Sequence, residues 1–252
     1  MPRILVTNDD GVRSDGILIL AKALEPIGEV TIVAPLTEAS AIGHALTLRR
    51  PLRLEAVAEQ TYSVDGTPTD CVNIAVTKVL GGMPDLVVSG INKGYNLGDD
   101  VTYSGTVAGA LEGALLGIPS LAVSLERTRG TFDFSHAASA AAAIATAVLQ
   151  NGLPARTLLN INVPRGKSKG FKITVQARRN HVTSVAEKID PRHQPYFWIE
   201  EGQSAWESNE RSDYAAVKAG YISVTPLHPD LTDYDALSHV ERLSFGREVE
   251  QC

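Results

Sequence analysis

The sequence has few cysteines and no long apolar run. Its 252 residues include only Cys71 and Cys252, so a disulfide-stapled secreted domain is excluded and a reducing compartment is favoured. The most apolar window, 137–149, is alanine-rich, contains Ser139 and is too short to span a bilayer. Charged residues also occur too early in the chain for the apolar stretch of a signal peptide. We therefore expect a soluble, cytoplasmic protein without a membrane partner.

Positive charge is also in deficit. The chain has 23 Lys and Arg against 29 Asp and Glu, a net charge of −6. This balance disfavours binding to a nucleic acid polymer but permits a small anionic substrate in a local site. The glycine-rich fingerprint of dinucleotide-binding folds is missing from the first strand–helix turn, which disfavours a cofactor of the NAD type.

Strands and helices alternate along the first two thirds of the chain. A strand at 3–7, a helix with Ile17, Leu20 and Leu24 at helical spacing, and a strand at 30–34 form a βαβ unit. The sequence therefore predicts an α/β fold with a mostly parallel sheet. Further strands are predicted at 85–89, 119–125 and 157–163, a hairpin within 52–64, and helices at 71–80, 104–117 and 134–150.

The pattern changes near Pro164, which is the best candidate for a boundary between a core, 1–164, and a C-terminal part, 165–252. The second part is predicted to contain a strand of antiparallel type at 170–177 and a protruding hairpin or arm at 178–201. The aromatic residues of this arm favour either base stacking or an oligomer interface. A final strand at 220–226 and a closing helix at 231–245 complete the prediction.

An acidic turn follows the first strand. Asn8-Asp9-Asp10-Gly11 would stand at the carboxyl edge of the sheet, where open α/β sheets bind ligands, if that strand is central. Adjacent carboxylates raise each other's pKa unless a cation lies between them, and carboxylates suit Mg²⁺ or Mn²⁺. Ordinary turn chemistry and helix capping explain the same residues, and the turn alone does not decide between these readings.

Two more loops bring oxygen ligands to the same predicted edge. Ser40 follows the second strand, and Asn92 and Asn96 follow the third. Ser104-Gly105-Thr106 then begins a helix whose free N–H groups would form a phosphate site, although a serine cap with a glycine for close packing explains them too. A metal beside a phosphate cradle indicates metal-assisted phosphoester hydrolysis.

Weaker candidates each have a simpler explanation. The two histidines would protonate a leaving group or serve structural roles, the lysine and the two aspartates would assist the site or be solvated, and the cysteine would pack in the core. These residues are His44, His228, Lys93, Asp99, Asp100 and Cys71.

Four ordered motifs together resemble the SurE family, the stationary-phase survival proteins with nucleotidase activity. The resemblance covers nearly the whole chain and is least diagnostic over 178–211. It departs from the family at Leu36-Thr37-Glu38-Ala39, where members often carry a polar run with an arginine, so an anion contact is in doubt. The motifs occupy 4–11, 66–71, 88–94 and 103–107, and the match continues through 160–164 and 220–228.

The resemblance implies a Rossmann-like three-layer fold with a C-terminal β-hairpin and helix extension that makes dimers or tetramers. It implies a phosphatase for nucleoside 5′-monophosphates, often also for 3′-monophosphates and short polyphosphate. It further implies one Mg²⁺ or Mn²⁺ per subunit and catalytic roles for Asp9, Asp10 and Asn96. The implied ligands of the ion are Asp9, Asp10, Ser40 and Asn92, and the implied phosphate-binding residues are Asn96, Ser104, Gly105 and Thr106.

Three alternatives stay open. A nucleotide-binding regulatory module would share the sheet without catalysis. A phosphatase with an aspartyl nucleophile would normally carry a second Asp two residues further on, where this chain has Gly11 or Val12. A purely structural oligomer would leave the acidic turn unexplained.

Overall fold

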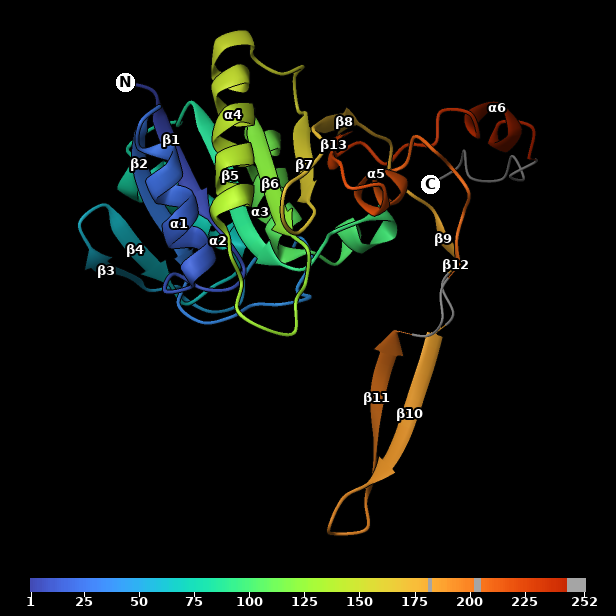
Figure 1. The fold of residues 1–252 in the computed structure, drawn as a ribbon. Helices are drawn as coiled ribbons and strands as arrows, with labels where there is room; N and C mark the ends of the chain where they lie inside the picture. The colour runs from blue at the N-terminus through green and yellow to red at the C-terminus, as the bar shows by residue number, and fades with distance from the viewer. Residues whose placement is uncertain (181–182, 202–204, 244–252) are drawn as a thin grey trace, which may run out of the picture.

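The computed structural model describes residues 1–180, 183–201 and 205–243. Its centre is a nine-stranded sheet with the order β3-β4-β2-β1-β5-β6-β7-β13-β8 (Figure 1). The strands of this sheet are β1 Arg3–Thr7, β2 Glu29–Pro35, β3 Leu54–Ala58, β4 Thr61–Val64, β5 Leu86–Lys93, β6 Ser120–Leu125, β7 Leu158–Val163, β8 Phe171–Ile173 and β13 Ile222–Leu227.

The order of the parallel strands creates a topological switch point between β1 and β5. β4, β2, β1, β5, β6 and β7 all pair in parallel, whereas β3 is antiparallel to β4 and β13 is antiparallel to β7. The chain passes from β1 to β2 on one side and later returns to β5 on the other side. The carboxyl ends of β1 and β5 therefore flank the topological switch point, where open α/β sheets bind ligands.

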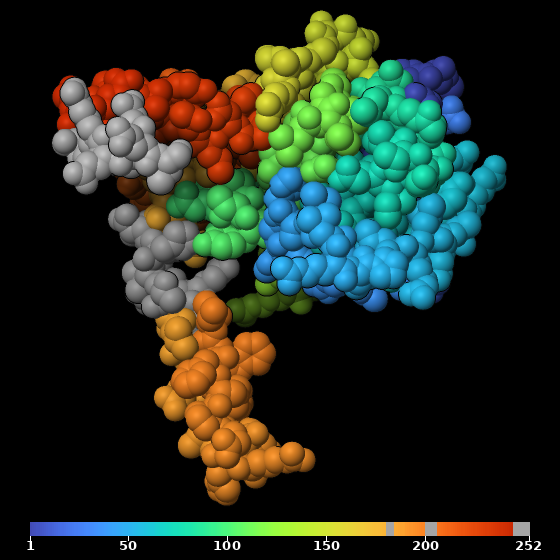
Figure 2. All heavy atoms as spheres, turned by 180° about the vertical axis from the view of Figure 1, so that it is seen from behind, coloured from blue at the N-terminus to red at the C-terminus, as the bar shows by residue number. Residues whose placement is uncertain are grey.

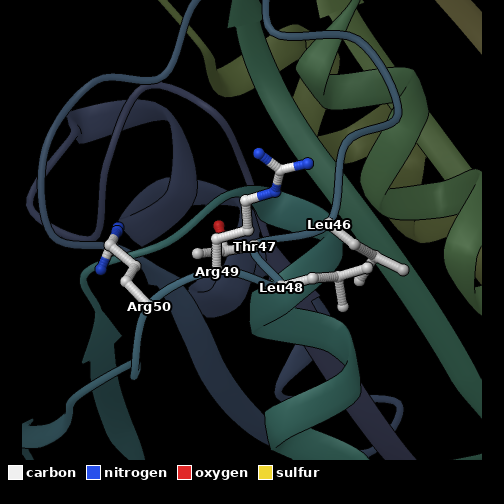
Figure 3. Close-up of a pocket in the computed structure, with 5 residues that line it drawn as sticks. All are labelled: Leu46, Thr47, Leu48, Arg49 and Arg50. Carbon is white, nitrogen blue, oxygen red and sulfur yellow. The ribbon is translucent and has the colours of Figure 1, made fainter.

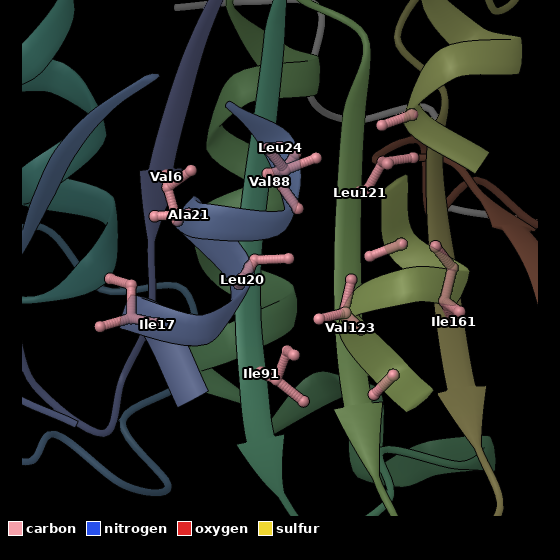
Figure 4. Close-up of a cluster of buried hydrophobic side chains, with 14 of the residues drawn as sticks. Val6, Ile17, Leu20, Ala21, Leu24, Val88, Ile91, Leu121, Val123 and Ile161 are labelled. Atoms are coloured by element: carbon pink, nitrogen blue, oxygen red, sulfur yellow. The ribbon is translucent and has the colours of Figure 1, made fainter. Parts of the chain in front are cut away.

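Helices cover both faces of the sheet. α1 Asp15–Leu24 and α4 Ser135–Asn151 lie on one face, and α2 Pro68–Ile74, η1 Ala75–Val79 and α3 Gly105–Leu115 lie on the other (Figure 1). Ile17, Leu20 and Leu24 of α1 are fully buried against the sheet (Figure 4). Because both faces are covered, the central strands are continuous apolar runs.

α3 approaches the sheet closely because three glycines, each four residues after the last, share its inner face. A Cβ on Gly109 would lie 2.9 Å from Thr7 Cγ2 and 3.0 Å from Ser89 Oγ, so even alanine would crowd the sheet here. The same face places Gly105 against the end of β1. The small residues therefore fix how near the start of α3 comes to the acidic turn.

The C-terminal part continues the same sheet and adds an arm. β13 and β8 extend the sheet beyond β7, so strands cross the boundary predicted at 164, and the two-part division itself stays a prediction. β10 Thr183–Ile189 and β11 Pro195–Glu201 form the predicted hairpin, which stands clear of the body in both views (Figures 1 and 2). The remaining elements are β9 Arg179–Asn180, β12 Ala205–Trp206, η2 Gly98–Thr102, α5 Asp213–Lys218 and α6 Leu237–Val240.

Two predictions for the C-terminal part are wrong. The strand predicted at 170–177 is only the short β8, and it pairs in parallel with β13, not antiparallel as predicted. The closing helix at 231–245 shrinks to α6, and residues 244 and 245 lie outside the described ranges. Asp230 accepts hydrogen bonds from Thr232 and Tyr234, and such local bonds hold the chain in a turn that competes with a helix.

Two boundaries in the core also differ from the prediction. The helix expected from Cys71 begins at Pro68, because Thr67 is its N-cap and forms a capping box with Asp70. β5 does not stop at Ser89 but runs through a bulge to Lys93, so Asn92 lies on a strand. Within the described ranges, no helix combines the length and apolar character that crossing a bilayer requires.

Candidate active site

The acidic turn is held by the side chain of Asn8. Its Nδ2 donates to Gly11 O at 3.1 Å and to Ser14 Oγ at 2.8 Å, and its Oδ1 accepts from Gly11 N at 3.2 Å. Gly11 has a φ of +97°, a conformation that glycine adopts without strain. This closed turn presents Asp9 and Asp10 beyond the end of β1. From the sequence, Asn8 was predicted only as part of a turn, and the hydrogen bonds by which its side chain closes that turn were not predicted.

Asp9 lies against the start of α3. Its side chain is 6% exposed, and its Oδ1 accepts from Thr106 Oγ1 at 2.5 Å. A Cβ on Gly105 would lie 2.8 Å from Asp9 Cβ, so only glycine lets the helix sit this close. Burial raises the pKa of Asp9 to about 6, and the charge of Asp10 adds to this rise, although the hydrogen bonds from Thr106 oppose it.

Asp10 is half-buried and leaves one oxygen unpaired. Among the described residues, none forms a hydrogen bond with its buried Oδ2. Burial raises the pKa of Asp10, the nearby Lys93 and Arg127 lower it, and Glu38 raises it further. An unpaired buried carboxylate oxygen beside a second carboxylate is the arrangement that a bound cation satisfies.

The loop that carries Ser40 is hydrogen-bonded to the backbone of Asp9. Ala39 N donates to Asp9 O at 2.8 Å, one residue before Ser40. Ser40 is exposed, and its hydroxyl donates to Glu38 Oε1 at 2.5 Å. Glu38 is thus a third carboxylate at this edge of the sheet, and it was not among the residues predicted from the sequence. Its position two residues before Ser40 in the same loop was the available signal.

Asn92 reaches the same edge from β5. β5 pairs with β1 through Thr7 and Ser89, and Asn92 follows three residues later, at the bulge. Its Nδ2 donates to Gly94 O at 3.0 Å, which leaves the side-chain oxygen as the atom able to ligate a cation.

Asn96 is buried and forms hydrogen bonds with the neighbouring strands β6 and β7. It is 7% exposed; its Nδ2 donates to Ser124 Oγ at 2.8 Å, and its backbone N donates to Asn162 Oδ1 at 2.8 Å. Its carbonyl accepts from both Asn160 and Asn162. These two asparagines alternate along β7 and so point to the same face, a pattern from which their shared role was predictable.

The start of α3 uses its hydroxyls differently from the sequence expectation. Ser104 is the N-cap, and its Oγ accepts from Val107 N at 3.1 Å, which leaves its own O–H proton to donate. Thr106 is fully buried and donates its hydroxyl to Asp9. Ser104 therefore keeps a donor for an anion, whereas the hydroxyl of Thr106 orients a carboxylate.

The weaker candidates fall into two groups. His44 Nε2 lies 2.7 Å from Glu112 Oε2, and Cys71 is fully buried in the core, so both have structural partners. His228 follows β13, whose residue Leu227 pairs with Leu158 at the start of β7. Because β13 is antiparallel, His228 lies at the opposite edge of the sheet from Asp9, and its suggested role as general acid is wrong within one chain.

Asp99 and Asp100 lie in η2, between Asn96 and Ser104. Asp100 Oδ1 accepts from Arg179 Nη1 at 3.1 Å, which ties this segment to the base of the arm. Lys93 ends β5, close enough to Asp10 to lower its pKa.

A hollow of about 530 Å³ lies elsewhere and is lined by residues 46–50 (Figure 3). None of the predicted site residues lines it. Across the part of the chain that the structure describes, no group of three or more His, Cys, Asp or Glu residues is placed to hold a metal ion. A cation at the acidic turn would therefore need neutral oxygens as well, which suits a hard ion.

Comparisons with known proteins agree with this architecture. The family model described as "Survival protein SurE" matches residues 4–183. The protein "5'-nucleotidase SurE" of Syntrophotalea carbinolica is 49% identical over 98% of this chain and 99% of its own length, and that of Geobacter sulfurreducens is 51% identical over 93% and 91%. The crystal structure of the Sure protein from Aquifex aeolicus covers 95% of this chain and 98% of its own, with a TM-score of 0.85 and 44% identity. The chain belongs to the SurE family.

Proposed function

We propose that this protein is a metal-dependent 5′-nucleotidase that hydrolyses nucleoside 5′-monophosphates to nucleoside and phosphate. The observation that carries the proposal is the acidic turn at the switch point of the sheet, seated directly against the start of α3 through Thr106 and Gly105. Carboxylates for a cation and a helix N-terminus for a phosphate then meet at one place. The relatives that align with nearly the whole chain are named 5'-nucleotidases, which supports the same reaction.

The proposed metal ligands are Asp9, Asp10, Ser40 and Asn92, around one Mg²⁺ or Mn²⁺. The unpaired oxygen of Asp10, the raised pKa of Asp9 and the all-oxygen donor set fit a hard divalent ion. When bound, such an ion supplies Lewis acidity toward phosphoryl oxygens and water.

The protein's own groups position the reactants. Thr106 holds the Asp9 carboxylate in one orientation, and the N-terminus of α3, with the hydroxyl of Ser104, stabilises negative charge on the phosphoryl group. Asn96 fixes the segment that leads from β5 to Ser104 through its bonds to Ser124 and Asn162. Its second amide N–H is the group proposed to reach the phosphate.

The arm is proposed to form a homodimer or homotetramer. Phe197, Trp198 and Ile199 of β11 are 60%, 59% and 85% exposed, and such a run of large apolar side chains is typical of an interface. A cytoplasmic location and activity on 3′-nucleotides or short polyphosphate belong to the proposal as expectations from the family.

Phosphate release across a panel of nucleoside 5′- and 3′-monophosphates tests the reaction. The expected result is release that requires Mg²⁺ or Mn²⁺, stops with a chelator, and is abolished in Asp9→Asn. Saturable nucleotide binding without any release would instead favour a regulatory module, and near-normal turnover by Asp9→Asn would refute the assigned site.

A further inference from the structure

One arginine at the rim of the site has no role in the proposal above. Arg127 lies in the loop that follows β6, at the same carboxyl edge of the sheet as the acidic turn. Its Nε donates to Lys93 O at 3.4 Å and lies 3.9 Å from where a Cβ on Gly94 would be. Its side chain therefore contacts the backbone at the end of β5, one residue after Asn92 in the chain.

The residues on both sides of Arg127 form hydrogen bonds with other segments. Glu126 N donates to Val163 O at 3.0 Å, and Glu126 Oε2 accepts from Arg165 N at 2.9 Å. On the other side, Arg165 Nη1 donates to Thr128 Oγ1 at 3.2 Å. The loop thus holds the start of the arginine side chain in a defined place, although the side chain itself is exposed. A preorganised cation loses less conformational entropy on binding an anion.

The charges around the site explain why a cation is needed here. Asp9, Asp10 and Glu38 bring three carboxyl groups to the rim, and Lys93 and Arg127 are the cations that act on Asp10. A phosphate monoester is a dianion near neutral pH and would be repelled by carboxylates that one divalent ion only partly neutralises. The residues directly before Ser40 include Glu38 and no arginine, so a positively charged contact to the phosphate would come from another segment.

We propose that Arg127 supplies this contact and donates hydrogen bonds to a phosphoryl oxygen of the substrate, with Lys93 as a second cation beside it. This inference rests on the proposed function, because it assigns the anion that both would bind. A guanidinium donates two parallel hydrogen bonds to a phosphate, which a lysine cannot reproduce. Arg127 is thus a substrate-binding residue supplied by the β6 loop.

Arg127→Gln, with Arg129→Gln as its matched control, tests the inference. Arg129 is exposed and lies two residues further along the same loop, and its substitution by glutamine removes the same charge. Two quantities are measured at low salt with Mn²⁺ present: the Kd of inorganic phosphate by calorimetry, and KM and kcat for a nucleoside 5′-monophosphate.

Arg127→Gln should weaken phosphate binding and raise KM by about tenfold, because a charge-assisted hydrogen bond at an exposed position is lost. The value of kcat should change by less than about threefold, since the reacting groups stay in place. Arg127→Lys should recover part of the affinity, as a point charge would. Arg129→Gln should match the wild type in both measurements.

Equal phosphate affinity in Arg127→Gln and Arg129→Gln would overturn the inference, and so would a wild-type protein that binds no phosphate. The proposed function fails separately, if the wild type binds phosphate with Mn²⁺ but releases none from any nucleotide. In that case the comparison of phosphate affinities still decides the role of Arg127.

Discussion

Asp9→Asn should stabilise the metal-free protein while removing its response to metal. The substitution keeps an oxygen to accept from Thr106 Oγ1 and deletes only the buried charge. Since the folded chain raises the pKa of Asp9 from 3.8 to about 6, and one pKa unit corresponds to about 1.36 kcal/mol, ionising Asp9 costs the fold about 3 kcal/mol. For a chain of this length, that corresponds to a rise in Tm of about 6 to 12 °C.

The sign of the pH dependence follows from the same pKa. A carboxyl whose pKa is raised on folding is protonated in both states below pH 3.8, so the penalty is absent there. It grows between pH 3.8 and about 6 and is complete above that. The advantage of Asp9→Asn in chelator should therefore be small near pH 4 and full at pH 8.

Thermal unfolding with chelator and with Mn²⁺, at pH 4 to 8, is the assay. Mn²⁺ at about 100 times its Kd should stabilise the wild type by about 2.7 kcal/mol and the variant far less. Asp235→Asn, an exposed aspartate, is the control and should behave like the wild type. A variant no more stable than the wild type in chelator at pH 8, or equally stabilised by Mn²⁺, would refute the reasoning.

Three further predictions concern the start of α3, a buried aspartate and the arm. Gly105→Ala would place a Cβ 2.8 Å from Asp9 Cβ, so phosphate release should fall at least about tenfold and stability by about 1 to 3 kcal/mol, whereas Gly130→Ala, in open space, should change neither. Asp213 Oδ2 accepts from Gly98 N, and its Oδ1 accepts from Ala177 N and Tyr214 N. Asp213→Asn replaces one of these two oxygens with an amide nitrogen that faces a backbone donor, which should cost about 1 to 3 kcal/mol in urea unfolding. Phe197→Ser on the arm should lower the mass of the assembly measured by light scattering, and Leu231→Ser, which changes a still more exposed apolar side chain outside the arm, should leave it unchanged.

The sequence predicted what depends on local periodicity and on strand order. Ile17, Leu20 and Leu24 repeat at helical spacing, so α1 was predictable from its own residues. The position of Asp9 and Asp10 followed from a rule about the carboxyl ends of parallel strands, and required only that β1 be central, which it is.

Other features depend on partners far along the chain. The hydroxyl of Thr106 turns to Asp9, 97 residues away, only because α3 lies so close to the sheet. Arg127 donates a hydrogen bond to the carbonyl of Lys93, 34 residues earlier in the chain, and no local sequence pattern predicts this contact. The reversed direction of β13, which carries His228 to the far edge, is likewise a matter of pairing rather than composition.

The position of β13 bears on how the chain is made. Among the strands that the structure describes it comes last in the chain, yet it lies between β7 and β8 rather than at a margin of the sheet. A nascent polypeptide that has not yet emerged beyond residue 227 would leave β7 with unpaired N–H and C=O groups, a template for pairing with another molecule. Products that stop before β13 should therefore aggregate, and the sheet is completed only after residue 227 has been synthesised.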